Sequence, residues 1–294
     1  MSDGRVLVTG GTGFIGSRIV GALAARGKPV RCLVRGGESP RDGVEAAKGD
    51  MTDADSLRRA AEGCDVVVHL VAGKLGLPAE FQNRMAQATK NLIGAAKDAG
   101  VQRFVLMSSL GTDERTAGLT AYSRAKWEAQ QALQASGLEW TVFKPSFVFG
   151  PDGGMLPDFK KLGRMPVIVV PGNGKRRLQP IWVDDVAAYY ATSVDLPAAA
   201  NRVFELGGPD AVTWNEFWRR MQSALGVKRP VMHVPMPMMR MQTRLTDRLP
   251  VKVPIDSAML KLLEAGDNAV SDPAAREVFD LPLVPLDEQL RRTA

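Results

Sequence analysis

The sequence predicts an α/β fold: a doubly wound parallel sheet with helices on both faces, followed by a smaller C-terminal α/β lobe. In the first half of the chain, short apolar runs alternate with amphipathic stretches, which is the rhythm of βαβ units. Because these runs are almost continuously apolar, they are typical of strands buried on both faces of a parallel sheet. A glycine-rich turn after the first run indicates a tight connection from strand to helix.

Each predicted strand in this half is followed by a helical pattern. The strands cover residues 5–8, 30–34, 66–71 and 104–107. The helices begin near Gly13, Asp53, Glu80 and Thr120. Acidic residues after position 52 favour a helix start there, because carboxylates interact well with first-turn amides.

After residue 150 prolines become frequent and the rhythm changes. We interpret residues 1–150 as one domain and residues 151–294 as a smaller lobe, with the chain returning to the first domain at about residues 178–206. One clear helix is predicted in this part, from Thr213 to Leu225, because Thr213 and Glu216 have the spacing of a capping box.

The composition excludes several classes of protein. Hydrophobic residues make up 45% and charged residues 24%, as in ordinary globular proteins. Cys32 and Cys64 are the only cysteines, and His69 and His233 the only histidines, so neither a disulfide framework nor a multi-histidine metal site is expected. Acid–base chemistry must therefore come from other side chains.

Charge and hydropathy bear on partners and location. Thirty-eight Lys and Arg against 32 Asp and Glu leave a net charge of +6, which favours anionic ligands or surfaces without identifying one. We expect no nucleic-acid partner, because neither a known module nor a basic stripe is present. No apolar run reaches the roughly 18–20 residues that span a bilayer, and the first strand leaves no room for a leader. We expect a cytoplasmic protein, free or peripheral at a membrane surface.

The glycine-rich turn lies between the first strand and the first helix, as a dinucleotide-binding fingerprint requires; it reads Thr9-Gly10-Gly11-Thr12-Gly13-Phe14-Ile15-Gly16. Gly10 and Gly11 let backbone N–H groups approach a pyrophosphate, and Gly13 opens a helix whose N-terminus attracts the anion. Gly16 permits close packing of helix and strand. The alternative is a merely tight turn, but the context favours a Rossmann domain that binds a nicotinamide dinucleotide.

The end of the second strand distinguishes the two nicotinamide cofactors. NAD(H) is held there by a carboxylate on the ribose hydroxyl, and NADP(H) by an arginine on the 2′-phosphate. In this chain Val34 is followed by Arg35, and no acid appears before Glu38. A guanidinium at this position can bind phosphate through paired hydrogen bonds, unless Arg35 is only a solvated side chain. The pattern favours NADP(H) over NAD(H).

Tyr122 and Lys126 stand four residues apart in a predicted helix and therefore share one face. A nearby ammonium favours tyrosinate and lowers the pKa of the phenol, which suits proton exchange with a carbonyl or carbinol oxygen. Such a pair also arises by chance. Here Ser108 and Ser109 end the preceding strand, at the sheet edge where ligands bind, and this supports a shared site.

With these residues the chain resembles the short-chain dehydrogenase/reductase superfamily, in its extended and atypical branches. Within it, the chain looks most like the NAD(P)-binding accessory subunits of respiratory complex I and their bacterial relatives. The resemblance covers about residues 5–225, and its motifs are highly specific for the superfamily and less so for this subgroup. Besides the glycine turn, the matching motifs are Gly49-Asp50 after a third strand, His69-Leu70-Val71-Ala72, the serine pair, Tyr122-Ser123-Arg124-Ala125-Lys126, and residues 143–151, 179–187 and 204–209.

The resemblance implies a role for each matching residue. Ser109 would orient the substrate, Tyr122 would be the general acid/base, and Lys126 would contact the nicotinamide ribose. Further cofactor contacts would come from Asp50 and Met51 at the adenine, Leu70, Val71, Ala72 and Gly73 along the cofactor, and Pro145, Ser146 and Phe147 beside the nicotinamide.

Two features depart from the extended enzymes. Alignment through Thr89 and Asn91 puts Met85 where many of them carry a proton-relaying asparagine. The interval from Ser109 to Tyr122 is also shorter than in the sugar-nucleotide epimerases, which leaves less loop to hold a large substrate. Both departures bear on turnover rather than on cofactor binding.

Two stretches of the second lobe have open interpretations. Residues 172–177 are predicted to form a turn with three cations. One interpretation is a site for an anionic substrate or a lipid headgroup, and the other is a solvated hairpin. Five methionines between Met232 and Met241 form either an adaptable surface for a partner, quinone or membrane, or a core or pocket wall.

Three functions are compatible with these observations. The complete Ser, Tyr and Lys set favours an NADP(H)-dependent reductase or dehydrogenase of a small carbonyl or carbinol substrate. Met85 and the short loop favour an accessory or assembly subunit of a respiratory complex that binds NADP(H) structurally or as a redox sensor. Epimerisation or dehydration of a nucleotide sugar uses the same cofactor, but the short loop weakens that hypothesis.

Overall fold

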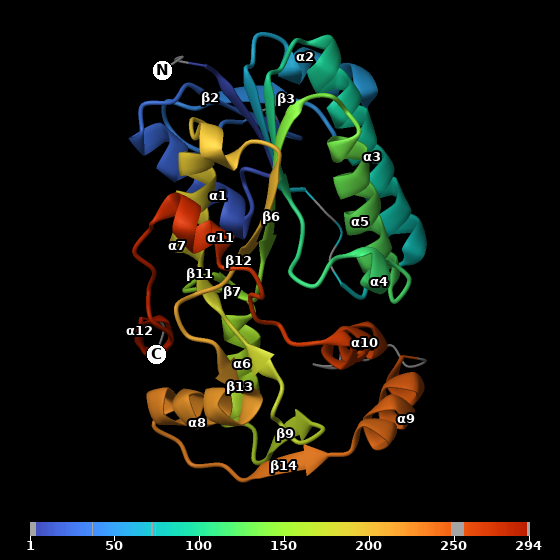
Figure 1. Ribbon diagram of the computed structural model, residues 1–294, viewed down its shortest axis with the longest axis vertical. Helices are drawn as coiled ribbons and strands as arrows, with labels where there is room; N and C mark the ends of the chain where they lie inside the picture. The colour runs from blue at the N-terminus through green and yellow to red at the C-terminus, as the bar shows by residue number, and fades with distance from the viewer. Residues whose placement is uncertain (1–3, 37, 72, 74, 248–255, 293–294) are drawn as a thin grey trace.

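A computed structural model describes residues 4–36, 38–71, 73, 75–247 and 256–292, and a seven-stranded parallel sheet lies at its centre (Figure 1). The strand order is β12-β6-β5-β4-β1-β2-β3. Its strands are β1 (Val6–Thr9), β2 (Val30–Val34), β3 (Glu45–Lys48), β4 (Val66–His69), β5 (Arg103–Met107), β6 (Glu139–Pro145) and β12 (Arg202–Leu206). The predicted Rossmann fold is confirmed, and its ligand-binding edge is at the carboxyl ends of these strands.

The four predicted strands agree with the observed ones to within two residues. β2 has the predicted bounds, β1 is shifted by one residue at both ends, β5 begins one residue earlier, and β4 ends at His69 rather than at residue 71. β3 was absent from the apolar runs because it is the edge strand, with both Glu45 and Lys48 exposed.

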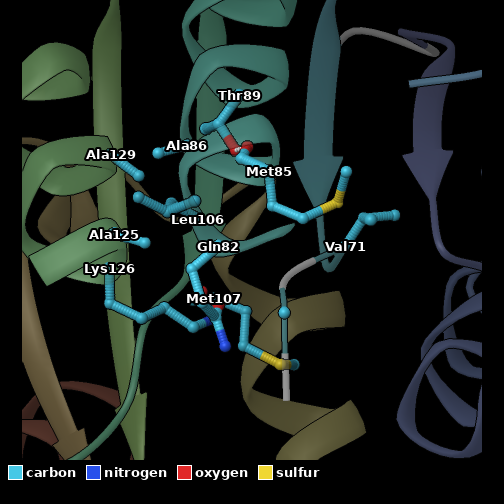
Figure 2. Close-up of a pocket in the computed structure, with 11 residues that line it drawn as sticks. Val71, Gln82, Met85, Ala86, Thr89, Leu106, Met107, Ala125, Lys126 and Ala129 are labelled. Carbon is cyan, nitrogen blue, oxygen red and sulfur yellow. Dashed lines mark hydrogen bonds between the residues drawn. The ribbon is translucent and has the colours of Figure 1, made fainter. Parts of the chain in front are cut away.

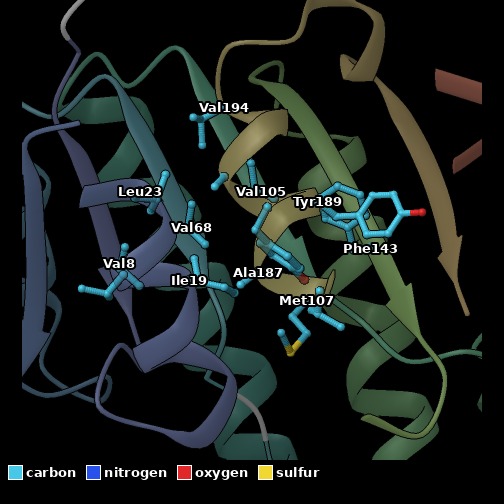
Figure 3. Packing of buried hydrophobic residues seen from close by; sticks show 14 of the residues in the cluster. Val8, Ile19, Leu23, Val68, Val105, Met107, Phe143, Ala187, Tyr189 and Val194 are labelled. Carbon is cyan, nitrogen blue, oxygen red and sulfur yellow. The ribbon is translucent and has the colours of Figure 1, made fainter. Parts of the chain in front are cut away.

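Helices cover both faces of the sheet. On one face lie α1 (Phe14–Ala25), α7 (Val183–Ser193) and α11 (Ala274–Phe279), and Figure 3 shows Ile19 and Leu23 of α1 packed beside Ala187 of α7 over the strands. On the other face lie α2 (Ala54–Ala61), α3 (Ala79–Asp98) and α5 (Ala121–Gln134), with α4 (Glu114–Ala117) just before α5. The Asp53 and Thr120 side chains cap α2 and α5, in agreement with the predicted starts.

The second lobe has its own aromatic core, in which Phe149, Phe159 and Phe217 are buried. Its helices are α6 (Leu156–Arg164), α8 (Trp214–Leu225), α9 (Met236–Thr246), α10 (Ser257–Ala265) and α12 (Leu286–Arg291). Its strands are β7 (Val148–Gly150), β8 (Gly153–Gly154), β9 (Ile168–Pro171), β10 (Arg177–Leu178), β11 (Ile181–Trp182), β13 (Val212–Thr213) and β14 (Val231–Val234). The short 3₁₀ segment η1 (Pro197–Ala199) follows α7 and packs in the core of the central sheet. Because α7 packs on the central sheet and β12 is one of its strands, the chain crosses back between the lobes after residue 182.

The expected capping box at α8 is only half formed. The Thr213 hydroxyl accepts a hydrogen bond from the Glu216 N–H at 3.2 Å, so the predicted cap is present. The Glu216 carboxylate instead accepts hydrogen bonds from Arg220, one turn further along the helix. The reciprocal half was wrong because an (i, i+4) guanidinium is a stronger partner for a carboxylate than a backbone amide.

Candidate functional site

The glycine turn is shaped by close backbone contacts. Gly10 has φ +79°, in the left-handed region, and its carbonyl oxygen accepts a hydrogen bond from the Gly13 N–H at 3.1 Å. A Cβ atom at position 16 would overlap that same carbonyl group, so only glycine fits there. Gly16 therefore packs the first helix against the turn itself, and the N-terminus of α1 opens toward the ligand-binding edge.

A cavity of about 630 Å³ extends from this turn along the ends of β2 and β3. Its lining residues are Gly10, Thr12, Leu33, Val34, Arg35, Gly36, Glu38, Gly49, Asp50, Met51, Thr52, Val71, Phe81, Arg84 and Met85. The Asp50 carboxylate accepts hydrogen bonds from the Thr52 side chain and backbone, and these lower its pKa. A fixed carboxylate beside apolar side chains suits the adenosine end of a dinucleotide.

Arg35 lies between this cavity and a second hollow of about 570 Å³. The second hollow is also lined by Lys48 and Arg59, two cations that the sequence prediction did not include. Within the described residues, none of these three cations forms an ion pair with a carboxylate. They converge from the ends of β2 and β3 and from α2, a placement that depends on the pairing of the strands.

The three predicted catalytic residues lie together at the end of β5. The Ser109 side chain lies beside Tyr122, close enough to favour the ionised form of the phenol. The Lys126 ammonium lies 5.9 Å from the centre of the Tyr122 ring and donates a hydrogen bond to the Met107 carbonyl oxygen at 2.7 Å. Since α5 starts at its Thr120 cap, Tyr122 and Lys126 occupy successive turns facing the loop that carries Ser109.

Burial, rather than the neighbouring ammonium, dominates the ionisation of this group. Burial raises the pKa of Tyr122, and the Ser109 side chain beside it opposes that shift only in part. Burial also lowers the pKa of Lys126 to about 7, because the charged form is less well solvated inside the protein. The expected lowering of the Tyr122 pKa was therefore wrong for the protein alone, and the phenol is protonated at neutral pH.

A small cavity of about 20 Å³, enough for a single water, lies beside Lys126. Figure 2 shows the Gln82 side chain from α3 and the Lys126 side chain from α5 reaching toward the same space. Met85 and Val71 line both this small cavity and the cavity of about 630 Å³ beside the glycine turn, which we call the dinucleotide cavity. The two cavities therefore adjoin. Gln82 is 1% exposed. The sequence analysis did not select Gln82 as a site residue, because in the sequence it is one of several polar residues of an amphipathic helix.

Several predicted cofactor residues have side chains turned away from the cavity. Thr9 is fully buried, and its hydroxyl is hydrogen-bonded to His69, whose pKa burial lowers to about 3. The Phe14 ring packs against the glycines of β7 and β8. Ile15 and Leu70 pack against the sheet core. Thr12, by contrast, is exposed at the cavity.

The remaining predicted residues lie at the junction of the lobes or beside α3. Pro145 is buried at the end of β6, and the Ser146 hydroxyl donates a hydrogen bond to Asn268 at 2.5 Å. The Phe147 ring packs edge-on against Phe159 in the second lobe. Further cofactor predictions lie in the loop after β4: Gly73 packs under the Gln82 amide, and Ala72 lies outside the described residues.

Lys144 is a second residue that sequence reasoning did not assign. It is buried, and its ammonium donates a hydrogen bond to the Thr112 carbonyl oxygen at 2.6 Å. The Thr112 N–H in turn donates to the Ser109 carbonyl oxygen at 3.1 Å, and the Leu110 N–H donates to Pro145. Lys144 therefore holds the short loop that positions the Ser109 hydroxyl. The sequence signal that could have indicated its role is a lysine within an otherwise apolar strand, because lysines are rarely buried without a partner.

A parallel doubly wound sheet with a glycine turn and a Ser, Tyr and Lys group at its carboxyl edge defines an NAD(P)-binding protein of the short-chain dehydrogenase/reductase type. A model of the family described as NAD(P)H-binding matches residues 10–195, and the chain belongs to this family.

Relatives and solved structures support this assignment. The chain is 33% identical to an NAD(P)H azoreductase of Xenophilus azovorans, with 78% of this chain and 76% of the relative covered. It is 28% identical to a mitochondrial NADH dehydrogenase [ubiquinone] 1 alpha subcomplex subunit 9 of Arabidopsis thaliana, covering 95% and 73%, which confirms the resemblance to complex I subunits. An NADPH-dependent quinone oxidoreductase of Escherichia coli complexed with NADPH shares the fold, with TM-score 0.76, 18% identity, and 98% and 99% coverage.

Proposed function

We propose that this protein is an NADPH-dependent reductase of a small carbonyl compound. The observation that carries the proposal is the grouping of Ser109 beside Tyr122, with Lys126 one turn away and its ammonium 5.9 Å from the Tyr122 ring centre, at the sheet edge near the dinucleotide cavity. The residues fit the cofactor: Gly13 is exposed at the N-terminus of α1, where backbone N–H groups can receive a phosphate, and the adjoining cavity is lined by both polar and apolar side chains.

The cofactor, when bound, would supply a hydride to the carbonyl carbon. The Tyr122 hydroxyl would donate a proton to the carbonyl oxygen, and Ser109 would hold that oxygen by a hydrogen bond. A raised Tyr122 pKa supports the reducing direction, because the phenol holds its proton at neutral pH. Lys126 would bind the ribose with the N–H groups not used on Met107.

NADPH rather than NADH is the proposed cofactor. Arg35 is exposed at the end of β2, Lys48 and Arg59 line the hollow beside it, and together they offer three cations to a 2′-phosphate. Asp50 and Asp53 also line that hollow, but Asp50 already accepts two hydrogen bonds from Thr52 and the Asp53 side chain caps α2. These contacts support a preference for the phosphorylated cofactor.

A second candidate function is a cofactor-binding accessory subunit of a respiratory complex. Met85, in place of a polar relay residue, lies where the Lys126 cavity meets the dinucleotide cavity, and an apolar side chain there does not assist proton supply. The 28% identity to the plant complex subunit over 95% of this chain also favours it.

A screen of quinones, azo compounds and ketones for oxidation of NADPH tests the two functions. The reductase proposal expects at least one substrate whose reduction Tyr122→Phe abolishes. If NADPH binds tightly, no compound in the screen is reduced, and the protein co-purifies with a respiratory complex, the accessory-subunit function replaces it.

A further inference from the structure

Exposed apolar side chains are concentrated in one part of the second lobe. Of the nine large apolar side chains that are exposed in the described part of the chain, Leu77 stands apart. The other eight, which we call the methionine surface, are Met165, Val167, Val169, Val231, Met232, Met238, Met241 and Leu245. Single exposed apolar residues are ordinary, but a gathering of this kind marks an interaction surface.

The secondary structure explains why these side chains face outward. Parallel pairing of β9 and β14 sets Met232 beside Val169, and both are exposed, whereas Ile168 and Val170 on the other side of β9 are buried. α9 begins two residues after β14 ends. Figure 1 shows β9, β14 and α9 at the end of the molecule away from β2 and β3.

On α9 the exposed residues form a stripe. Met238, Met241 and Leu245 are 56%, 68% and 65% exposed and follow the three- and four-residue spacing of one helix face, while Met239 is buried. Arg240 and Arg244 flank Met241 and Leu245 around a hollow of about 430 Å³. The Arg240 guanidinium is paired with Glu264 at 2.7 Å, whereas Arg244 forms no ion pair with a described residue.

The charge of this part of the chain has one sign. Residues 159–183 and 217–246, which contain all eight members of the methionine surface, hold twelve Lys and Arg and no Asp or Glu. The rest of the chain holds 26 Lys and Arg against 32 Asp and Glu. The net positive charge therefore lies in these two segments, and the remainder is acidic. Arg219 and Arg220 of α8 are paired with carboxylates, whereas Arg244 lies among the exposed apolar side chains of α9.

We propose that the methionine surface docks on an anionic lipid bilayer. A bilayer offers negative phosphates and an apolar interior at the same place, which matches cations interleaved with apolar side chains. Arg244 contacts lipid phosphates, and Met241 and Leu245 enter the boundary between headgroups and acyl chains. No helix among the described residues is long and apolar enough to cross a membrane, so contact is made from the surface.

Co-sedimentation with vesicles tests the proposal. We expect binding to vesicles of phosphatidylcholine with phosphatidylglycerol, much weaker binding to phosphatidylcholine alone, and release by salt. Arg244→Gln should weaken partitioning about fivefold. Met241→Ser combined with Leu245→Ser should weaken it at least about tenfold, because two exposed apolar side chains no longer enter the bilayer.

Matched controls are exposed residues elsewhere: Lys97→Gln on α3 for the charge and Leu77→Ser for the apolar contact, neither of which should change partitioning. Unchanged NADPH affinity and far-UV circular dichroism show that each variant is folded. Absence of vesicle binding, or equal binding by all variants, overturns the proposal. If the protein is a dimer that the Met241 and Leu245 variant dissociates, and neither form binds vesicles, the surface belongs to a second copy and the lipid proposal is wrong.

Discussion

The ammonium of Lys126 lies 5.9 Å from the centre of the Tyr122 ring, but its hydrogen bond goes to the Met107 carbonyl oxygen. Tyr122 instead has Ser109 beside it. Under the proposed function the two residues divide the work: the phenol would give its proton to a substrate, while the lysine, anchored on the end of β5, would contact the cofactor. This division leads to separate predictions for each residue.

Tyr122→Phe should lower the rate of substrate reduction by about 10²–10⁴-fold and leave NADPH affinity unchanged, because it removes only the proton donor. The rate is measured as NADPH oxidation with a substrate found in the screen. Tyr190→Phe is the matched control, since Tyr190 is fully buried in the sheet core, away from the site. Full activity in Tyr122→Phe would show that another group supplies the proton.

NADPH binding should be coupled to proton uptake by Lys126. Burial lowers its pKa to about 7, so at pH 8 the amine is mostly neutral in the free protein. The negative charges of the cofactor favour the ammonium and raise this pKa on binding. Calorimetric titration at pH 8 in two buffers of different ionisation enthalpy should detect the proton.

Lys126→Met should abolish the proton uptake that accompanies NADPH binding, and it should weaken NADPH affinity and the rate of substrate reduction. Lys97→Met, on the exposed side of α3, should leave the proton uptake unchanged. Proton uptake that persists in Lys126→Met would assign the coupling to another group.

Arg35→Ala should weaken NADPH binding more than NADH binding, since only NADPH carries the 2′-phosphate that a guanidinium can hold. The expected loss of NADPH affinity is at least about tenfold, as for a charge-assisted hydrogen bond of roughly 1.5–3 kcal/mol. Titrations with both cofactors measure it, with exposed Arg26→Ala at the end of α1 as the control. Equal affinities for the two cofactors in the unmodified protein would contradict the NADPH assignment.

Gly16→Ala should destabilise the fold by about 3 kcal/mol and abolish NADPH binding, because the added methyl overlaps the Gly10 carbonyl group. Gly94→Ala should instead stabilise the protein, because nothing lies near a Cβ atom at that exposed position in α3. Alanine forms helices better than glycine, so the free energy of unfolding should rise by up to about 1 kcal/mol. Chemical denaturation compares the two. A Gly16→Ala protein of normal stability would refute the close packing of α1 on the turn.

Asp185 makes stability depend on pH. Burial raises its pKa to about 6, although its carboxylate accepts a hydrogen bond from the Val284 N–H at 2.9 Å. Because the pKa is higher in the folded protein, the folded state is destabilised when the carboxyl is ionised, above about pH 6. The free energy of unfolding rises again as the carboxyl is protonated between about pH 6 and pH 4.

Asp185→Asn, which keeps an acceptor for Val284, should therefore raise the free energy of unfolding by up to about 3 kcal/mol at pH 8 and by much less at pH 4. Thermal unfolding of both proteins across this range measures the difference. A difference that does not vary with pH would show that ionisation of Asp185 is not the cause.

Local sequence was enough to predict the parts of the fold that depend on neighbours in the chain. The buried strands, the capped starts at Asp53 and Thr120, and the glycine turn were all readable, because apolar periodicity, caps and turn residues act over a few positions. The edge strand β3 was not, because an exposed strand carries no apolar run.

Contacts between distant residues decided the chemistry of the site. Only the packed structure joins Ser109 to Tyr122, brings Lys48 and Arg59 to the hollow beside Arg35, and turns the Thr9 hydroxyl toward His69 instead of the cavity. Burial by the surrounding helices and strands sets the pKa of Lys126. The physical reason is that solvation and hydrogen bonding depend on which groups surround a side chain in space, and sequence spacing specifies that only within one helix, strand or turn.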